Sequence, residues 1–570
     1  MGIASNLAMN TSSLRKPAQV MQLERLGSLH QFRLSFMRIL VRRIMHEQWR
    51  IDCSLFQLDE QGYGTVVYTV QASHHSFSFV LFSHYLRDED RNDRVIASQW
   101  DLTMALCIGE VDGQQIEMLK ANVPKQEAGR VNADTMVLSR ANRSSRNFEY
   151  VVNKLAGGQQ PCAEKLKDVG YLYRTTAVYG SGKFGMADWS KVESQYPDFA
   201  RPFSAEMFTC YMLRHFSVEQ AQFLAKMRSP KTAVAMEDGL RRYIGIGNAT
   251  GLGMAPYLIR HPQLISQGIT VRETAIARVL VNGRVNIQYI EQLNALAAKA
   301  RKHFQETTVP DEQQARRNRT LIDELAELPC WLEKHPQIDR WSDLTCHAQQ
   351  HWHLETQELI HSLLMELYPE LVDELEDSMC AQELPATQPD MPVEQLKKLI
   401  ESRYCWVLAI DFEQPAAQHL FWYRSEEKME PRIGERFSEP GADREIPLLT
   451  IARCVRQCYD LLCADLLQHG GSDVVHFLIR QPDMKGITAR IQTMAQDPYG
   501  DIQANLADKE MLPIHLLRCK LSFFGVSKFD PKSKLWVRNT MFQGSPLLAD
   551  IGKPFHDDWC FPLAPVQVSS

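Results

Sequence analysis

The sequence lacks a long hydrophobic run. No stretch reaches about eighteen consecutive apolar residues, which is roughly what a helix needs to span a bilayer. The first residues, MGIASNLAMNTSSLRKPAQVM, contain no continuous apolar segment of the kind found in secretory signals. We therefore predict that the chain carries no secretory signal and does not associate with a membrane.

The sequence also lacks paired cysteines and an excess of positive charge. Its thirteen cysteines are scattered and form no CxxC pair, which is typical of a reducing compartment and predicts a cytoplasmic location. The formal net charge is −6 and the pI is about 6.3. Because a general nucleic-acid-binding protein usually has a basic domain, we expect no nucleic-acid partner.

Several catalytic and metal-binding signatures are missing. The chain has no GxSxG elbow, no set of protein-kinase motifs, no HExxH and no EF-hand. His347, His351 and His361 give HxxxH and ExxH spacings, but the region is polar and no second set of inward carboxylates is evident. We predict a solvated helix there, and no metal site.

The 570 residues are too many for one ordinary core, so the chain is expected to form several domains. Period-two apolar patterns predict strands between residues 49 and 86, and helical patterns prevail from about 113 to 300. We divide the chain into a mobile arm (1–20), an N-terminal α+β half with glycine-rich loops (21–300), a helical connector (301–390) and a C-terminal α+β half (391–570).

Two segments suggest an internal duplication. Residues 179–184 (YGSGKF) and 524–529 (FGVSKF) share an aromatic-Gly-x-x-Lys-Phe pattern, and apolar segments at 53–59 and 405–411 precede them at a similar offset. We predict a helix-dominated α+β fold with two duplicated halves, each with a small antiparallel sheet, joined by the helical connector. Chance similarity is the alternative.

The first of these segments is a tight glycine-rich turn that presents a lysine. It differs from a phosphate-binding NTPase loop because Ala177 occupies the first glycine position and Phe184 follows Lys183. Such a turn can direct backbone N–H groups at an anion. We predict that Tyr179 and Lys183 act as acid or base; a structural turn with a solvated lysine is the alternative. Arg174, which precedes this pair, and Ser181, which lies between its two members, are predicted to bind the substrate.

A second glycine cluster spans residues 245–253 (GIGNATGLG). Its GxxxGxG spacing at Gly247, Gly251 and Gly253 resembles the glycine pattern of short-chain dehydrogenases, which implies a nicotinamide cofactor. A glycine-rich loop before a helix is also an anion site, with Asn248 and Thr250 as further donors. Close helix packing is the structural alternative.

Two further segments carry candidate charged residues. Arg272 is predicted to clamp a carboxylate and Glu273 to serve as a general base, with a buried Arg–Glu structural pair as the alternative. Arg424 follows the aromatic run at 421–423 and is predicted to line the mouth of a pocket for a charged metabolite. A solvated loop is the alternative there.

These features predict a cytoplasmic, homodimeric enzyme that acts on a small anionic metabolite, a carboxylate, by metal-free, lyase-like acid–base chemistry. The predicted catalytic residues are Tyr179, Lys183 and Glu273, and the predicted substrate-binding residues are Arg174, Ser181, Asn248, Thr250, Arg272 and Arg424. The sequence does not identify a cofactor. An NAD(P)-dependent oxidoreductase and a non-catalytic helical interaction protein are the alternatives.

Overall fold

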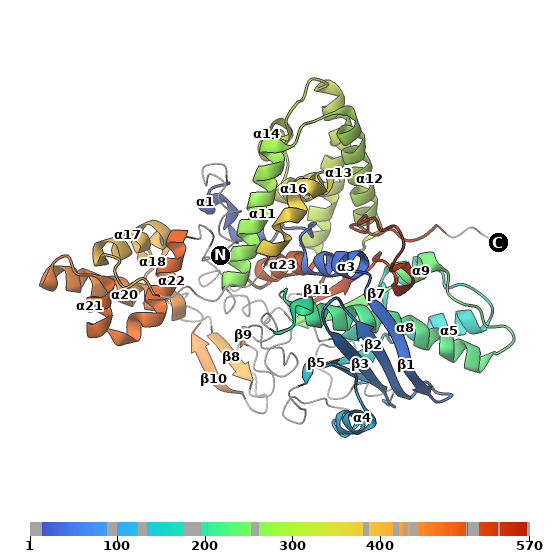
Figure 1. The fold of residues 1–570 in the computed structure, drawn as a ribbon. Coiled ribbons are helices and arrows are strands. Elements are labelled where there is room, and N and C mark those ends of the chain that lie inside the picture. The colour runs from blue at the N-terminus through green and yellow to red at the C-terminus, as the bar shows by residue number, and fades with distance from the viewer. Residues whose placement is uncertain are drawn as a thin grey trace.

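The chain forms a mixed α+β structure in which helices predominate (Figure 1). The computed structural model describes residues 14–87, 100–123, 134–175, 195–201, 203–251, 262–379, 387–413, 421–425, 431–433, 442–447, 450–496, 499, 512–533 and 536–566. The mixed α+β class predicted from the sequence is confirmed.

One nine-stranded sheet lies at the centre of the fold. Its order is β1-β2-β3-β4-β5-β6-β7-β12-β11, and neighbouring strands are antiparallel except β6 and β7. A parallel pair needs a long crossover, and α8 (Ser204–Arg228) and α9 (Asp238–Tyr243) lie within this one. The strands are β1 (Arg50–Leu58), β2 (Gly64–Gln71), β3 (Ser76–Ser83), β4 (Leu102–Ile108), β5 (Thr135–Arg143), β6 (Tyr171–Thr175), β7 (Gly245–Gly251), β11 (Lys528–Ser533) and β12 (Trp536–Met541).

Both faces of the sheet are covered, as β3 illustrates. Successive strand residues point to opposite faces. Phe77 and Phe79 of β3 belong to the main core, whereas Val80 joins a smaller cluster with Leu119 of α4 (Gly113–Lys120). The sheet is therefore a middle layer, with most of the apolar mass on one side.

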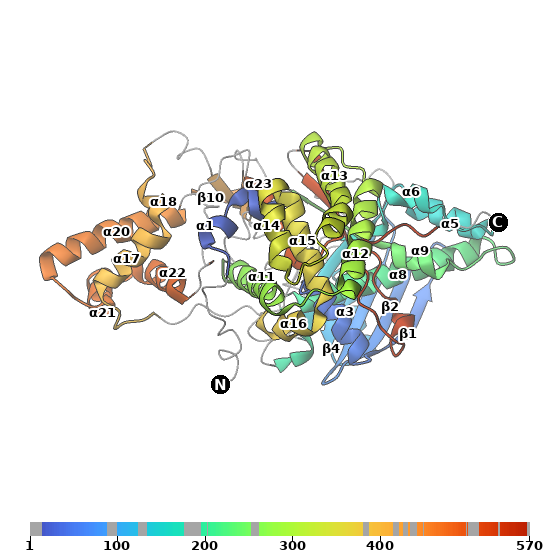
Figure 2. The ribbon, with the colours of Figure 1, turned by 90° about the horizontal axis from the view of Figure 1, so that it is seen from above.

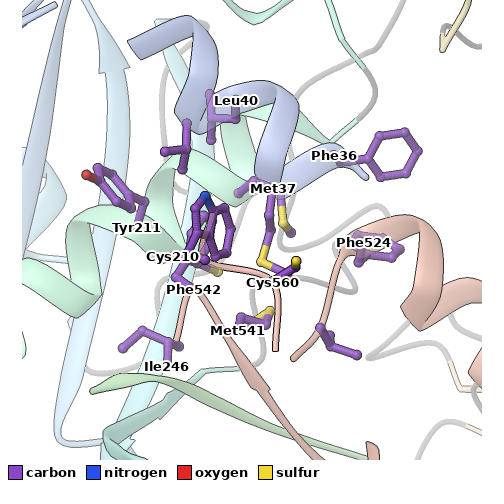
Figure 3. Packing of buried hydrophobic residues seen from close by; sticks show 14 of the residues in the cluster. Phe36, Met37, Leu40, Cys210, Tyr211, Ile246, Phe524, Met541, Phe542 and Cys560 are labelled. Carbon is purple, nitrogen blue, oxygen red and sulfur yellow. The ribbon is translucent and has the colours of Figure 1, made fainter. Parts of the chain in front are cut away.

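The main core joins parts of the chain that are distant in sequence (Figure 3). Met37 comes from α3 (Phe36–His46), Cys210 from α8 and Ile246 from β7, and they share one cluster with Met541 and Cys560. All five side chains are almost completely buried. The C-terminal part of the chain is consequently part of the same core as the N-terminal strands.

A group of long helices stands beside the sheet (Figure 1). Side-chain caps start two of them: Asn286 accepts a hydrogen bond from the Tyr289 amide, and Asp311 accepts one from the Gln314 amide. The helices are α11 (Pro262–Asn282), α12 (Ile287–Glu306), α13 (Glu312–Lys334), α14 (Trp341–His351) and α15 (Leu354–Leu367). The shorter helices of this part of the protein are α1 (Pro17–Val20), α2 (Leu23–Leu26), α5 (Phe148–Ala156), α6 (Ala163–Lys167), η5 (Pro197–Phe199), α16 (Pro369–Val372), η7 (Asp373–Ser378), α23 (Leu512–Phe524) and η10 (Leu548–Asp550).

A second group of helices forms a lobe to the side of the sheet (Figure 2). It has its own apolar cluster, which includes Leu396, Ile400, Val455 and Leu462. Its helices are α17 (Val393–Arg403), α18 (Cys405–Leu408), α20 (Thr450–His469), α21 (Val474–Arg480), η8 (Pro482–Met484) and α22 (Lys485–Gln496). Within the same stretch of chain, a three-stranded sheet consists of β8 (Phe421–Ser425), β9 (Pro431–Ile433) and β10 (Ala442–Pro447).

The predicted duplication into two halves with one small sheet each is wrong. The apolar runs at 405–411 and 517–525 both predict strands, but the first begins with helix α18 and the second belongs mainly to helix α23. Strands β11 and β12 complete the large sheet that β1 begins. Short apolar runs do not distinguish a buried helix from a buried strand, which is why the two assignments failed.

Among the helices that the structure describes, none combines the length and the apolar composition required to cross a bilayer.

Candidate functional site

The predicted catalytic turn lies outside the described residues. Tyr179, Ser181 and Lys183 all fall within 176–194, so their roles remain predictions. Arg174 is fixed in β6, where its Cα partner is Gly247 of β7. It makes contacts within the protein and lies one residue before the end of the described strand.

The second glycine cluster forms a strand, which corrects the prediction of a loop before a helix. Gly245–Gly251 make up β7, which pairs with β6 on one side and β12 on the other. A Cβ atom at Gly247 would lie 2.3 Å from the ring of Tyr171, so glycine is needed for packing. Backbone N–H groups committed to a sheet do not cradle a phosphate. For this strand, the resemblance to dehydrogenases therefore has no structural counterpart.

Asn248 connects two strands, and its role as a substrate ligand stays a prediction. Its side chain is completely buried, and Nδ2 donates a 2.6 Å hydrogen bond to the carbonyl oxygen of Thr175. This bond ties β7 to the end of β6. Thr250 pairs with Val537 of β12, and its side chain lies outside the described part of the structure.

Arg272 and Glu273 belong to a buried ion network, which was the structural alternative. Nη2 of Arg272 lies 2.7 Å from Oε2 of Glu358, and Glu273 accepts two hydrogen bonds from Arg15. Nη1 of Arg25 adds a 2.6 Å contact to Glu358. Three arginines thus enclose two carboxylates at the junction of α11, α15 and the N-terminal segment. Breaking such a network is costly, so its members hold the elements together.

The network keeps Glu358 ionised. Burial alone would raise the pKa of Glu358, but the charges of Arg15 and Arg272 hold that pKa well below its ordinary value. His361, expected on a solvated helix, is buried beside Glu358, and burial is the main cause of its lowered pKa. Glu273 pairs with Arg15 and Arg272, as the structural alternative expects, and its role as a general base stays a prediction.

Arg424 lies in β8, where its Cα partners are Arg444 of β10 and Pro431 of β9. It is therefore part of a strand and does not belong to the loop beyond it. Its side chain is outside the described atoms, and its role at a pocket mouth remains a prediction.

The arrangement best suited to proton transfer is a pair of histidines held by one buried aspartate. His74 and His75 lie in the turn between β2 and β3, and Asp198 lies in η5. Nδ1 of His75 is 2.8 Å from Oδ2 of Asp198, and Nδ1 of His74 is 3.2 Å from Oδ1. The backbone N–H of His74 also donates to Oδ1, at 3.0 Å. The aspartate side chain is fully buried, whereas those of His74 and His75 are 55% and 37% exposed.

This geometry fixes the proton on a particular nitrogen of each ring. An ionised carboxylate only accepts hydrogen bonds, so each histidine must carry its proton on Nδ1. The neutral ring then presents the lone pair of Nε2 away from the aspartate. Neither Nε2 of His74 nor that of His75 is hydrogen-bonded to another described residue. Both are thus oriented as proton acceptors.

The carboxylate is kept ionised by the histidines themselves. Burial would raise the pKa of Asp198, but the hydrogen bonds from His75 and His74 outweigh it and hold the pKa below its ordinary value. A charged aspartate stabilises a histidine that has accepted a proton, because an imidazolium ion donates from Nδ1 with a full positive charge.

A hydrogen-bond network holds the β2–β3 turn and η5, which carry His74, His75 and Asp198, in place. Ser73 of the turn donates to Glu47, which also accepts from Arg43 and from Nε1 of Trp49. Arg43 in turn donates to the carbonyl oxygens of Pro197 and Asp198, at 2.7 and 3.1 Å. A site held by such contacts keeps its geometry without a ligand.

Aromatic packing fixes both sides of the same site. Phe199, next to Asp198, packs in the core against Phe77 of β3, with ring centroids 4.8 Å apart. The ring of Tyr196 lies 5.3 Å from that of His75. The turn and η5 are therefore anchored to each other through both polar and apolar contacts.

The two histidines are not arranged to share a metal ion. Their ring centroids are 6.5 Å apart, whereas two imidazoles bound to one tetrahedral zinc ion have centroids about 5 Å apart. Elsewhere in the described ranges, no group of three or more His, Cys, Asp or Glu side chains is placed to hold a metal. The donor set favours proton transfer over metal binding.

Sequence reasoning missed this site. The adjacent histidines at 74 and 75 stand between two strand patterns, where a turn presents side chains to solvent, and this was the available signal. Nothing in the sequence connects them with Asp198, which is 123 residues beyond His75.

The chain matches no protein-family model, no curated protein and no solved structure. Functional inference therefore depends on the geometry of these residues.

Proposed function

We propose that this protein is an enzyme that acts on a small anionic metabolite by acid–base chemistry at His74, His75 and Asp198. One observation carries the proposal: a buried carboxylate orients two partly exposed imidazoles with their Nε2 atoms outward. Positioned histidines are the commonest acid–base catalysts at neutral pH.

The proposed reaction is an elimination from a carboxylate substrate. Nε2 of His75 takes a proton from a carbon atom, and the electron pair of that C–H bond forms the new double bond. A protonated His74 gives its proton to the departing hydroxyl group, which leaves as water. Asp198 stabilises whichever ring is charged, and exchange with solvent restores both protonation states.

The anionic substrate class comes from the sequence, and one contact supports it. Nη1 of Arg43 donates to the carbonyl oxygen of Asp198 at 3.1 Å, so a positively charged guanidinium group lies next to the site. Glu47, which pairs with Arg43 at 2.8 Å, offsets part of this charge, so the anionic class rests mainly on the sequence.

A purely structural role is the competing explanation. Asp198 would then simply connect the β2–β3 turn to η5 through three hydrogen bonds. The two explanations differ in what happens to a proton on a bound substrate, and this difference can be measured without knowing the product.

Hydrogen–deuterium exchange on carbon tests the proposal. The full-length protein is incubated in D₂O with a panel of small hydroxy acids and related carboxylates, and loss of C–H signals is followed by proton NMR. We expect exchange or elimination for at least one compound. His75→Gln should slow it by roughly a hundredfold, and Asp198→Asn should slow it as well, because the ring loses its orientation.

A matched control is available in the same chain. Nδ1 of His353 is 2.6 Å from Oε1 of Glu324, so this pair repeats the histidine–carboxylate contact on an exposed helix end. His353→Gln should leave the exchange rate unchanged. The proposal is wrong if the wild type exchanges no member of the panel, or if His75→Gln exchanges as fast as the wild type.

The cytoplasmic location and the homodimer remain predictions.

A further inference from the structure

A small, partly enclosed cavity lies where six segments of the chain meet, away from the histidine site. Its volume is about 40 Å³, enough for roughly three water molecules. Its walls come from the segment before α3, from α12 and α13, from α23 and β11, and from the C-terminal segment. Segment 524–529, which carries the FGVSKF motif, contributes part of one wall.

Two polar side chains in the wall have hydrogen-bonding atoms without partners. Gln31 is 6% exposed, and neither its Oε1 nor its Nε2 has a hydrogen-bond partner among the described residues. Arg518 is 5% exposed, and its Nη1 also lacks a partner there. Buried polar atoms are almost always satisfied, so three such atoms around one cavity indicate an occupant.

The remaining contacts of Arg518 hold its guanidinium group in place. Nε donates to the carbonyl oxygen of Leu29 at 3.2 Å, and Nη2 lies 2.5 Å from Oε1 of Glu355. The guanidinium carbon is 4.9 Å from the ring centroid of Phe529. The unpartnered Nη1 is therefore the remaining donor of an otherwise fixed group.

The surroundings of the cavity favour an anion over a cation. Burial is the main cause of a lowered pKa for Arg518, and the charge of Arg317 lowers it further although Glu355 acts in the opposite direction. His30, which lines the cavity, is neutral because burial and the charge of Arg518 lower its pKa well below the ordinary value. Lys528 also lines the cavity, but its Nζ donates to the carbonyl oxygens of Lys167 and Asp168. Around the guanidinium group of Arg518, the charges of Arg518 and Arg317 thus stand against that of Glu355.

We propose that the cavity binds a small carboxylate of the size of formate or acetate, with one oxygen on Nη1 of Arg518 and the other on Nε2 of Gln31. The Gln31 carbonyl oxygen then accepts from a water molecule. Phe304, Phe529 and Phe561 provide the apolar side of the site, against which a methyl group packs. This site shares no residue with the histidine site, so the proposal is independent of the proposed function.

The test compares wild-type protein with Gln31→Leu, which removes both unpartnered atoms at similar volume. Formate and acetate, at constant ionic strength against chloride, should raise the Tm of the wild type in a saturable way. Gln31→Leu should fold, because it removes a buried unsatisfied amide, and should bind roughly tenfold more weakly or worse. Gln349→Leu, a change at an exposed glutamine of α14, should bind as the wild type does.

A second measurement does not depend on the variant. Saturation of the aromatic protons of the wild type should transfer to the methyl group of acetate, because phenylalanine rings line the cavity. Benzoate, which exceeds the space, should neither raise the Tm nor displace acetate. The absence of a Tm shift and of transfer would mean that the cavity holds water only. Equal binding by Gln31→Leu and the wild type would also overturn the assignment.

Discussion

Arg15 and Glu273 form a two-point hydrogen bond, Nε to Oε2 and Nη2 to Oε1, both at 2.7 Å, although 258 residues separate them. The arginine precedes α1, and the glutamate lies in the middle of α11. Part of the predicted mobile arm is therefore fixed to the helical layer. The carbonyl oxygen of Arg15 also accepts from the hydroxyl of Tyr499, at 2.6 Å.

Replacing this arginine should destabilise the protein. Arg15→Met leaves Glu273 and Glu358 with fewer cations, and removing one partner of a buried pair costs about 3 kcal/mol or more. Chemical denaturation should show this loss, and Glu273→Gln added to Arg15→Met should cost less than the sum of the single changes. Lys16→Met, at the exposed neighbouring position, should change stability by about 0.5 kcal/mol at most. Equal effects of Arg15→Met and Lys16→Met would contradict the network.

Glu206 should make stability depend on pH near neutrality. It lies in the first turn of α8, and burial raises its pKa to about 7. A folded pKa above the unfolded one means that stability is fully present below about pH 4.5 and is lost as the pH rises through 7. Glu206→Gln should thus be more stable than the wild type by about 3 kcal/mol at pH 8, with little difference at pH 4. Thermal unfolding at both pH values measures this, and a constant difference would show that ionisation is not its cause.

Gly247→Ala should destabilise the protein, because position 247 of the second glycine cluster has no room for a side chain. The new methyl group would meet the ring of Tyr171 at 2.3 Å, and overpacking of this kind costs about 1–3 kcal/mol. Tyr171→Leu should relieve part of that cost. Gly486→Ala in α22, where no atom lies within 4 Å of the added carbon, should instead stabilise by about 0.5–1 kcal/mol. If Gly247→Ala is neutral, close packing does not explain the glycine.

The ring tautomers of His74 and His75 provide a test that needs no substrate. Two-bond nitrogen–proton correlation spectra at neutral pH should show both rings protonated on Nδ1, because Asp198 only accepts. Asp198→Asn should change the tautomer of at least one ring, and it should also lower the Tm at pH 7.

That loss of stability has a defined pH dependence. The lowered pKa of Asp198 means that its contribution is present above the unfolded value and is lost as the pH falls through the folded one. The difference between Asp198→Asn and the wild type should therefore begin to shrink near pH 4 and disappear only at pH values below the folded pKa. A difference that persists at lower pH, or rings protonated on Nε2, would contradict the assigned hydrogen bonds.

The sequence by itself determined the local properties of the chain. Residues 65–71 and 76–83, which are rich in Val, Phe and Tyr, predict strands, and these became β2 and β3. The helical pattern of 286–303 corresponds to α12, and that of 355–379 covers α15, α16 and η7. These assignments succeed because a period of two or of 3.6 residues depends only on which face of one element is buried.

The tertiary structure alone decided which residues meet. Glycine at 247 reads as a loop residue until the ring of Tyr171 is placed against it. The sequence allows Arg272 and Glu273 to be either substrate-site residues or a buried structural pair. Only the structure shows that Arg15 and Glu358 join them in a buried ion network. His75 and Asp198 form one site only because η5 packs beside the β2–β3 turn. Contacts of this kind depend on the chain topology. The topology is determined by the apolar surface that the whole core buries, and a local sequence pattern does not show this.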